Sequence, residues 1–206
     1  GLPERQGLYS PEQEHDACGV GFIAHIKGKP SHAIVEQGLQ ILRNLTHRGA
    51  VGADPLAGDG AGILIQMPDT FLRREFGRQD LQLPKNGDYA LGMLFLPRAA
   101  HTRAACEQII AAVVKEEGQT FIGWRDVPTN NTRLGKGVQA VEPVVRQACI
   151  GRGTSTPPKA FERKLFVIRK VVEHRVRALD LPDKDMFYAP SLSSRTLVYK
   201  GMLLAD

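Results

Sequence analysis

The stretch ACGVGF, residues 17–22, marks a sharp change in the character of the chain. Residues 1–17 are polar and have no apolar core, so they are typical of a tail or leader and not of a secretory signal. Residues 18–26 are small and apolar, and predict a buried strand. A cysteine that starts such a strand, between small neighbours, could stand open to a substrate, and glycines at 19 and 21 let another segment approach closely. The alternative is a buried structural cysteine.

Helices and strands follow one another along most of the remaining chain. The apolar spacing predicts helices over residues 31–46, 102–117 and 161–179. It predicts strands over residues 61–67, 89–96, 120–127, 144–150, 187–192 and 197–203. No regular strand–helix–strand alternation is present, which favours an α+β layered fold over a doubly wound one. Because an apolar strand comes just before Asp206, we expect further chain beyond it.

The composition limits the classes of function. The 206 residues are 42% hydrophobic and 24% charged with a net charge of +5, an ordinary balance for a globular domain. No apolar run approaches the roughly 18 residues of a membrane helix, so we expect no membrane partner. Cys18, Cys106 and Cys149 form no C-x-x-C pair, so we expect no disulfide scaffold and no metal site. Reduced thiols of this kind are typical of a cytoplasmic protein.

Four further stretches are informative together: HRGA at 47–50, GDGAG at 58–62, GWRDVPT at 123–129 and YKGM at 199–202. With CGVGF at 18–22, the first two resemble the class II glutamine amidotransferase domain that opens the large chain of glutamate synthase. The last two resemble glutamate synthase specifically, and not the purine or amino-sugar amidotransferases of that class. The resemblance runs from Cys18 to the end of the chain.

The resemblance implies a fold and a mechanism. The fold would be the αββα sandwich of the N-terminal-nucleophile hydrolases, with residues 18–206 as its front part and residues 1–17 as a leader. Cleavage between Ala17 and Cys18 would free the α-amino group of Cys18, whose pKa of about 7.7–8.0 suits a general base. The Cys18 thiolate would attack the glutamine side-chain amide, release ammonia and leave a glutamyl thioester. With Ala17 still attached, we expect the chain to be inactive.

The resemblance also assigns roles around the nucleophile. Arg48, followed by Gly49, would shape the glutamine pocket, since a guanidinium suits a carboxylate; the alternative is an arginine at the end of the preceding helix. Gly58, Asp59 and Gly60 would form a tight turn beside the active site. The GDGAG stretch lacks the G-x-G-x-x-G spacing and precedes a strand, so it does not predict a dinucleotide site.

Other implied parts lie outside these residues. The parent enzyme would pass ammonia to 2-oxoglutarate, carry FMN and an iron–sulfur cluster, and work with the rest of the large chain and a small NAD(P)H-oxidising subunit. No cofactor is expected in this chain itself. The family's later glutamine clamp and its oxyanion Asn-Gly have no match here, since Asn86-Gly87 reads as an ordinary turn. A truncated or degenerate amidotransferase used for binding or assembly is the alternative, and a related enzyme with another ammonia acceptor is a third reading.

The predicted helix at 161–179 and the residues just before it are rich in cations, which could form a nucleic-acid surface. No aromatic residues interleave with the cations for base stacking. We therefore expect a solvated or docking face and no nucleic-acid partner. The cations concerned are Lys159, Arg163, Lys164, Arg169, Lys170, Arg175 and Arg177.

Overall fold

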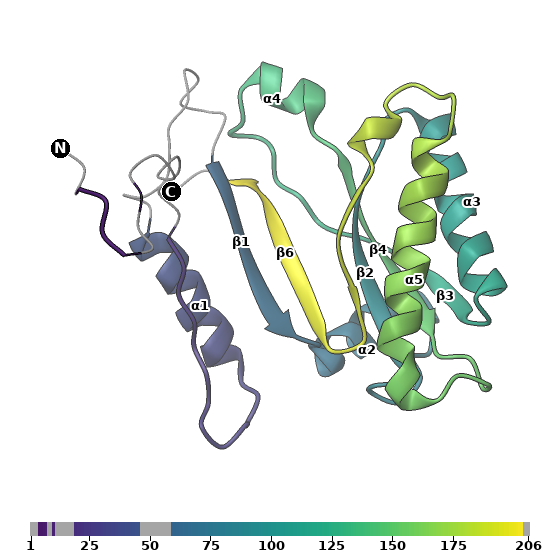
Figure 1. Ribbon diagram of the computed structural model, residues 1–206, viewed down its shortest axis with the longest axis horizontal. Helices are drawn as coiled ribbons and strands as arrows, with labels where there is room; N and C mark the ends of the chain where they lie inside the picture. The colour runs from purple at the N-terminus through teal and green to yellow at the C-terminus, as the bar shows by residue number, and fades with distance from the viewer. Residues whose placement is uncertain (1–3, 8–9, 11–18, 46–58, 204–206) are drawn as a thin grey trace. The chain divides into compact units, whose positions relative to one another are not determined.

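The computed structural model describes residues 4–7, 10, 19–45 and 59–203 (Figure 1). The chain divides into two units. The smaller comprises Gly1–Ala61 and Gly201–Asp206, and the larger comprises Gly62–Lys200.

A four-stranded antiparallel sheet forms the centre of the larger unit. Its order is β3 (Thr120–Asp126), β4 (Val144–Gly151), β2 (Tyr89–Leu96) and β5 (Tyr188–Ser193). Strand β2 has the sequence YALGMLFL and is almost wholly buried. A near-continuous apolar strand is stable only where both of its faces are covered, as both faces of β2 are. Its two edges pair with β4 and β5, so β2 lies inside the sheet.

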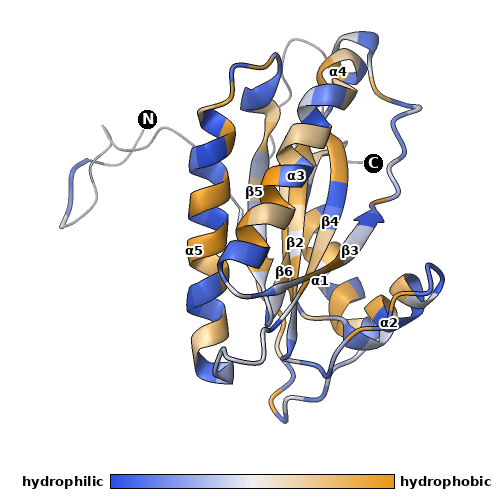
Figure 2. Ribbon diagram, turned by 90° about the vertical axis from the view of Figure 1, so that its right-hand side faces the viewer, coloured by the Kyte–Doolittle hydropathy of each residue, from blue (hydrophilic) through white to orange (hydrophobic). Residues whose placement is uncertain are grey.

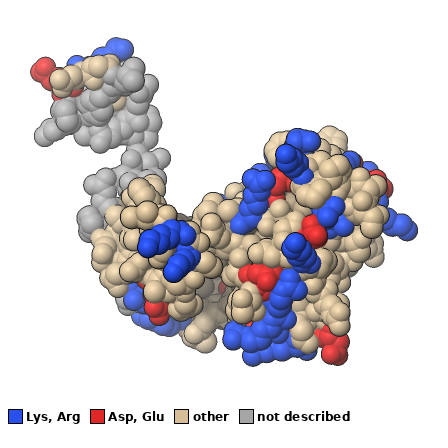
Figure 3. Space-filling model, turned by 90° about the horizontal axis from the view of Figure 1, so that it is seen from below, with Lys and Arg blue, Asp and Glu red and all other residues tan. Residues whose placement is uncertain are grey.

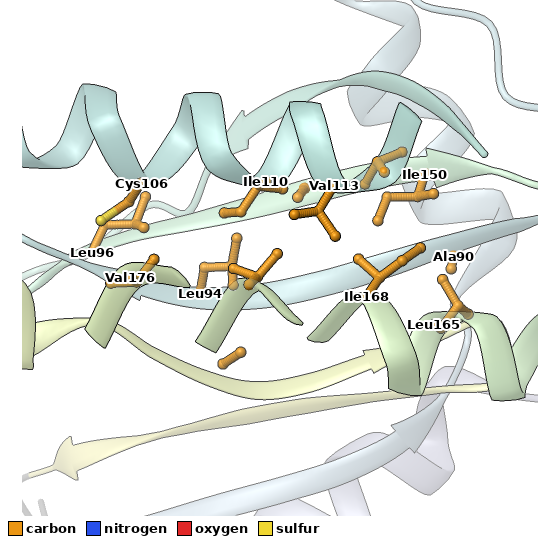
Figure 4. Packing of buried hydrophobic residues seen from close by; sticks show 14 of the residues in the cluster. Ala90, Leu94, Leu96, Cys106, Ile110, Val113, Ile150, Leu165, Ile168 and Val176 are labelled. Carbon is orange, nitrogen blue, oxygen red and sulfur yellow. The ribbon is translucent and has the colours of Figure 1, made fainter. Parts of the chain in front are cut away.

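Helices α3 (Ala100–Glu116) and α5 (Pro158–Arg177) cover one face of this sheet (Figure 2). Alternate residues of β2 and β4 point toward the apolar sides of the two helices, and Figure 4 shows how these side chains interdigitate. The labelled members of this cluster are Ala90, Leu94, Leu96, Cys106, Ile110, Val113, Ile150, Leu165, Ile168 and Val176.

The opposite face of the sheet carries a second apolar cluster. Tyr89, Leu91 and Met93 of β2 point into it, together with Cys149 of β4. Helix α2 (Asp69–Gly77) contributes fully buried side chains, and so does strand β6 (Thr196–Leu203). Strand β6 pairs with β1 (Asp59–Gln66) as a separate two-stranded sheet. Within Gly62–Lys200 the sheet thus lies between a helical layer and a layer made of α2 and the β1–β6 ribbon.

The α+β class and most predicted elements are confirmed. Strand β2 has the predicted bounds, and the other predicted strands from residue 61 onward are present with boundary shifts of a few residues. Helix α1 (His32–Asn44) lies within the predicted range 31–46 and begins after Ser31, whose side chain makes no capping hydrogen bond. Helices α2 and α4 (Lys136–Val141) and the short 3₁₀ helix η3 (Lys184–Met186) were not predicted.

The strand predicted over residues 18–26 is wrong for its described part. Residues 19–26 contain no strand, and the Val20 and Phe22 side chains are 91% and 88% exposed. Apolar character alone does not make a strand, because a strand also needs a neighbour that accepts its backbone hydrogen bonds. Within the described ranges, residues 19–26 have no such pairing.

Candidate functional site

Most of the predicted catalytic residues lie outside the described part of the chain. This applies to Ala17, Cys18, Arg48, Gly49 and Gly58. The described segments that adjoin these residues carry the geometry of the candidate site. Those segments are residues 19–45 of the smaller unit and strands β1 and β6, which contain residues 59–62 of GDGAG and all of YKGM.

In the smaller unit, the residue that follows Cys18 lies against the end of helix α1. A Cβ atom added to Gly19 would stand 2.7 Å from Leu45 Cδ2, and one added to Gly21 would stand 2.6 Å from Ile41 Cγ2. Both distances are shorter than ordinary carbon–carbon contacts, so a larger residue at either position would have to displace the Leu45 or Ile41 side chain. The segment after Cys18 therefore contacts the helix that leads toward HRGA at 47–50.

The GDGAG stretch leads directly into a strand. Asp59 and Gly60 are the first two residues of β1, which begins two residues before the predicted start. A dinucleotide-binding loop is followed by a helix. The strand found here therefore agrees with the prediction that GDGAG is not such a loop. The role of Gly58, Asp59 and Gly60 as an active-site turn stays a prediction.

In the larger unit, Gly62 lets β1 approach β6 closely. A Cβ atom added to Gly62 would stand 2.7 Å from Lys200 Cβ and 2.9 Å from the backbone oxygen of Tyr199. The Met67 N–H donates to the Arg195 oxygen at 2.8 Å while Gly62 lies against Lys200, so the two strands run antiparallel. The last glycine of GDGAG is thus required by its contact with the start of the YKGM stretch.

The arginine of GWRDVPT is buried under α2. Arg125 is 6% exposed, and its Nη2 donates to Glu75 Oε2 at 3.0 Å while its Nη1 donates to Gln147 Oε1 at 3.0 Å. The guanidinium also lies 5.2 Å from the ring centroid of Phe71. The hydrogen bond from Arg125 holds the pKa of Glu75 below its usual value. The sequence did not single out Glu75 or Gln147, because neither residue differs from a surface polar residue until the strands are paired.

The two described cysteines are not suited to catalysis. Cys106 and Cys149 are fully buried. Burial raises the pKa of the Cys106 thiol to about 11 and that of Cys149 to about 12. They lie in separate apolar clusters, so they do not fit an iron–sulfur cluster. No group of three or more potential metal ligands is present in the described ranges.

The cations of α5 are largely engaged with carboxylates. Lys164 Nζ lies 2.7 Å from Glu117 Oε2, and Arg175 Nη2 lies 2.6 Å from Glu116 Oε2. Lys170 pairs with Glu173 on the same helix. Figure 3 shows acidic side chains interspersed among the Lys and Arg side chains. This pairing supports a solvated helix face.

Two smaller points concern the remaining sequence predictions. The Asn86-Gly87 turn is confirmed: the Asp88 N–H donates to the Lys85 oxygen at 2.8 Å, and Gly87 has a φ of 90°.

Among the helices that the structure describes, none has both the length and the apolar character needed to cross a membrane.

Comparison with known proteins assigns a family to the chain, and the matched residues include Cys18. Residues 18–206 match the family model described as "Glutamine amidotransferases class-II". The chain is 47% identical over 208 residues to the glutamate synthase [NADPH] large chain of Bacillus subtilis (strain 168), a match that covers all of this chain and 13% of that protein. It is 40% identical to the glutamate synthase [NADH] of Schizosaccharomyces pombe, with 98% of this chain and 10% of that protein covered. It is 36% identical to the ferredoxin-dependent glutamate synthase 2 of Synechocystis, with 93% and 12% covered. The chain thus spans only 10–13% of the length of these relatives.

Proposed function

The chain belongs to the class-II glutamine amidotransferases, and we propose that it is the glutaminase part of a glutamate synthase. The observation that carries the proposal is that the family match begins at Cys18 itself. The similar glutamate synthases are named for three electron donors, NADPH, NADH and ferredoxin. Similarity that persists across different donors supports a step that does not involve the donor, and ammonia release is such a step.

Cys18 is the proposed nucleophile. After cleavage of the Ala17–Cys18 bond, the free α-amino group takes the thiol proton, and the sulfur attacks the side-chain amide carbon of L-glutamine. The protonated amine then gives its proton to the leaving nitrogen, so that ammonia departs and a glutamyl thioester remains. Water hydrolyses the thioester to glutamate and regenerates the thiol. An amide nitrogen cannot take the thiol proton, so the leader keeps the chain inactive.

The neighbouring residues have proposed roles in the same pocket. Arg48 and Gly49 shape the glutamine site, and Gly58, Asp59 and Gly60 form the turn beside it. The close approach of Gly19 to Leu45 supports this arrangement, because it joins the segment after Cys18 to the helix that precedes Arg48. Packing of the segment after Cys18 against α1 limits the motion of that segment, which favours a preorganised pocket.

The proposed fold is the αββα sandwich, with residues 18–206 as its front part after the leader of residues 1–17. The helices on one face of the four-stranded sheet and the β1–β6 ribbon on the other support it. The family's oxyanion donors have no counterpart in these residues. Because the loss of one such donor typically costs a hundred- to a thousand-fold in rate, we expect no turnover from residues 18–206 alone.

The wider enzyme is part of the same proposal. Ammonia passes to 2-oxoglutarate, and reduction of the imine yields L-glutamate. FMN and an iron–sulfur cluster would reside in the rest of the large chain, since Cys106 and Cys149 are unsuited to hold iron. A small subunit would oxidise NAD(P)H, and the assembly would be cytoplasmic.

The test is made on the full-length enzyme. Intact-mass measurement should find Cys18 as the first residue of the active protein. Cys18→Ala should lower glutamine-dependent glutamate formation at least about a thousand-fold, because no other group replaces the nucleophile. Glutamate formation from added ammonium should persist in the same variant, since that reaction bypasses the glutaminase.

A matched control is Cys106→Ala, which removes a thiol that is buried in the α3 layer. It should leave glutamine-dependent activity within about two-fold of the parent. Normal glutaminase activity in protein that still carries residues 1–17 would refute the free-amine mechanism.

A further inference from the structure

Residues from three of the motif stretches come together in the larger unit, and none of these residues takes part in the proposed chemistry. The stretches are GWRDVPT through Arg125, YKGM through Tyr199, and the end of GDGAG through Gly62. They are far apart in the sequence. The residue that joins the first two is Gln147 in β4.

The side-chain amide of Gln147 links Arg125 of β3 to Tyr199 of β6, and it can do so in one orientation only. It is fully buried, and it lies opposite Arg125 in the β3–β4 register. Arginine can only donate, so the Gln147 Oε1 atom must face Arg125. The Gln147 Nε2 group then points away from Arg125 and donates to Tyr199 Oη at 3.0 Å. Arg125 therefore sets the orientation of the amide that holds Tyr199.

Arg125 itself is fixed from a third side. Glu75 of α2 accepts a hydrogen bond from its other terminal nitrogen, and the Glu75 side chain is only 15% exposed. A buried arginine without its carboxylate would be strongly unfavourable, so the pair is held together. The chain of contacts runs from α2 through β3 and β4 to β6.

The hydrogen bond to Tyr199 gives the β1–β6 ribbon a directional contact, which its apolar contacts do not provide. Leu197 and Ile65 pack into the second apolar cluster, but apolar contacts are not directional and tolerate sliding. A two-stranded ribbon is also only marginally stable by itself. The Val198 N–H donates to Ser191 Oγ at 3.2 Å and ties β6 to β5, whereas Tyr199 ties β6 to β4.

We infer that Arg125, Gln147 and Tyr199 are positioning residues that fix the register of the β1–β6 ribbon on the four-stranded sheet. Gly62 transmits this register to β1, because its missing side chain lets β1 lie directly against Tyr199 and Lys200. Gly62 follows Gly60 by two residues in the same strand, so the network sets the point at which the chain leaves the proposed active-site turn. The catalytic part of this inference rests on the proposed glutaminase function.

The decisive variant is Tyr199→Phe in the processed full-length enzyme. It removes the hydroxyl and keeps the ring, so the fold should be retained. We expect the glutaminase kcat to fall about ten-fold while KM for glutamine changes less than about two-fold, since misplacement of the turn affects the reaction geometry more than binding. Ammonium-dependent activity should not change.

Tyr188→Phe is the matched control. The Tyr188 hydroxyl accepts a hydrogen bond from Lys200 Nζ of β6 at 3.1 Å, but Tyr188 is 46% exposed, so Tyr188→Phe removes only an exposed hydrogen bond and leaves Arg125, Gln147 and Tyr199 in contact. Its kcat should equal that of the parent. Gln147→Leu combined with Tyr199→Phe should lose no more than the worse single variant, because the two residues act through one hydrogen bond.

Hydrogen exchange gives a readout that does not depend on activity. The amides of residues 62–66 should exchange faster in Tyr199→Phe than in the parent or in Tyr188→Phe. Faster exchange with an unchanged kcat would overturn the catalytic role and leave a purely structural network. Unchanged exchange would overturn the inference altogether. A parent enzyme without Cys18-dependent glutaminase activity would instead refute the proposed function, and with it the catalytic role, while the exchange result would still decide the register.

Discussion

Cys106 and Cys149 lie on opposite sides of the four-stranded sheet, each inside an apolar cluster. Because burial raises the pKa of their thiols to about 11 and about 12, almost no thiolate is present at pH 8. We expect iodoacetamide at that pH to modify both at least about a hundred-fold more slowly in the folded protein than after unfolding. Mass spectrometry of the labelled peptides measures this. Rapid labelling of Cys149 in folded protein would contradict its burial.

The sequence identifies single residues only where a motif surrounds them. Cys18 could be singled out because CGVGF, HRGA and GDGAG occur in a known order. Gln147 could not, because the segment VVRQACIG shows one polar residue in an apolar strand and no hint of its partner. Its role depends on the register that places it opposite Arg125 and on the strand that brings Tyr199 within 3.0 Å.

Helix α5 holds the turn between β5 and β6 through one carboxylate. Glu162 Oε1 accepts hydrogen bonds from the Ser194 N–H at 2.7 Å and from Ser194 Oγ at 2.5 Å, and Glu162 Oε2 accepts one from Ser193 Oγ at 3.1 Å. Glu162→Ala leaves these donors without their acceptor. We expect it to lower the free energy of unfolding by about 2 kcal/mol, measured by urea denaturation.

The neighbouring substitution Arg163→Ala serves as the control for Glu162→Ala. Arg163 is exposed, and the change should stay within about 0.5 kcal/mol. Equal losses in the two variants would show that the effect does not come from the hydrogen bonds between Glu162 and the turn.

At the level of elements, the sequence predicts those whose ends are marked. Pro68, Pro97 and Pro128 follow β1, β2 and β3 closely, and Gly118 lies beyond α3 with a φ of 71°. Helix α2 was missed because it is short and follows Pro68, although its buried Leu72 and Phe76 have helical spacing. The strand expected at residues 18–26 failed because a composition does not specify a pairing partner.

The acid stability of the whole molecule should depend on two carboxylates near α2. The hydrogen bond from Arg73, with a further one from Tyr89, lowers the pKa of Asp69, and Arg125 lowers that of Glu75. A lowered folded-state pKa contributes stability above the unfolded value of about 4, and this contribution is lost as the pH falls through the folded value. We therefore expect the urea midpoint to fall between pH 5 and pH 2.

Asp69→Asn provides the comparison for the acid limb. An amide has no proton to gain in this range, so the variant should start with a lower midpoint at pH 7 and lose less of it on acidification. The same acid dependence in Asp69→Asn and in the parent would exclude Asp69 as a contributor.

Strand β2 has hydrogen-bonded neighbours on both sides, and helices and the ribbon cover its two faces. No local fluctuation can expose its amides to water without separating β4 or β5 from it. In deuterated buffer the interior amides of β2 should therefore be the last to lose their protons, through opening of the entire fold. Their exchange rate gives the global unfolding free energy directly, and can report the effect of any substitution elsewhere in the larger unit without denaturant.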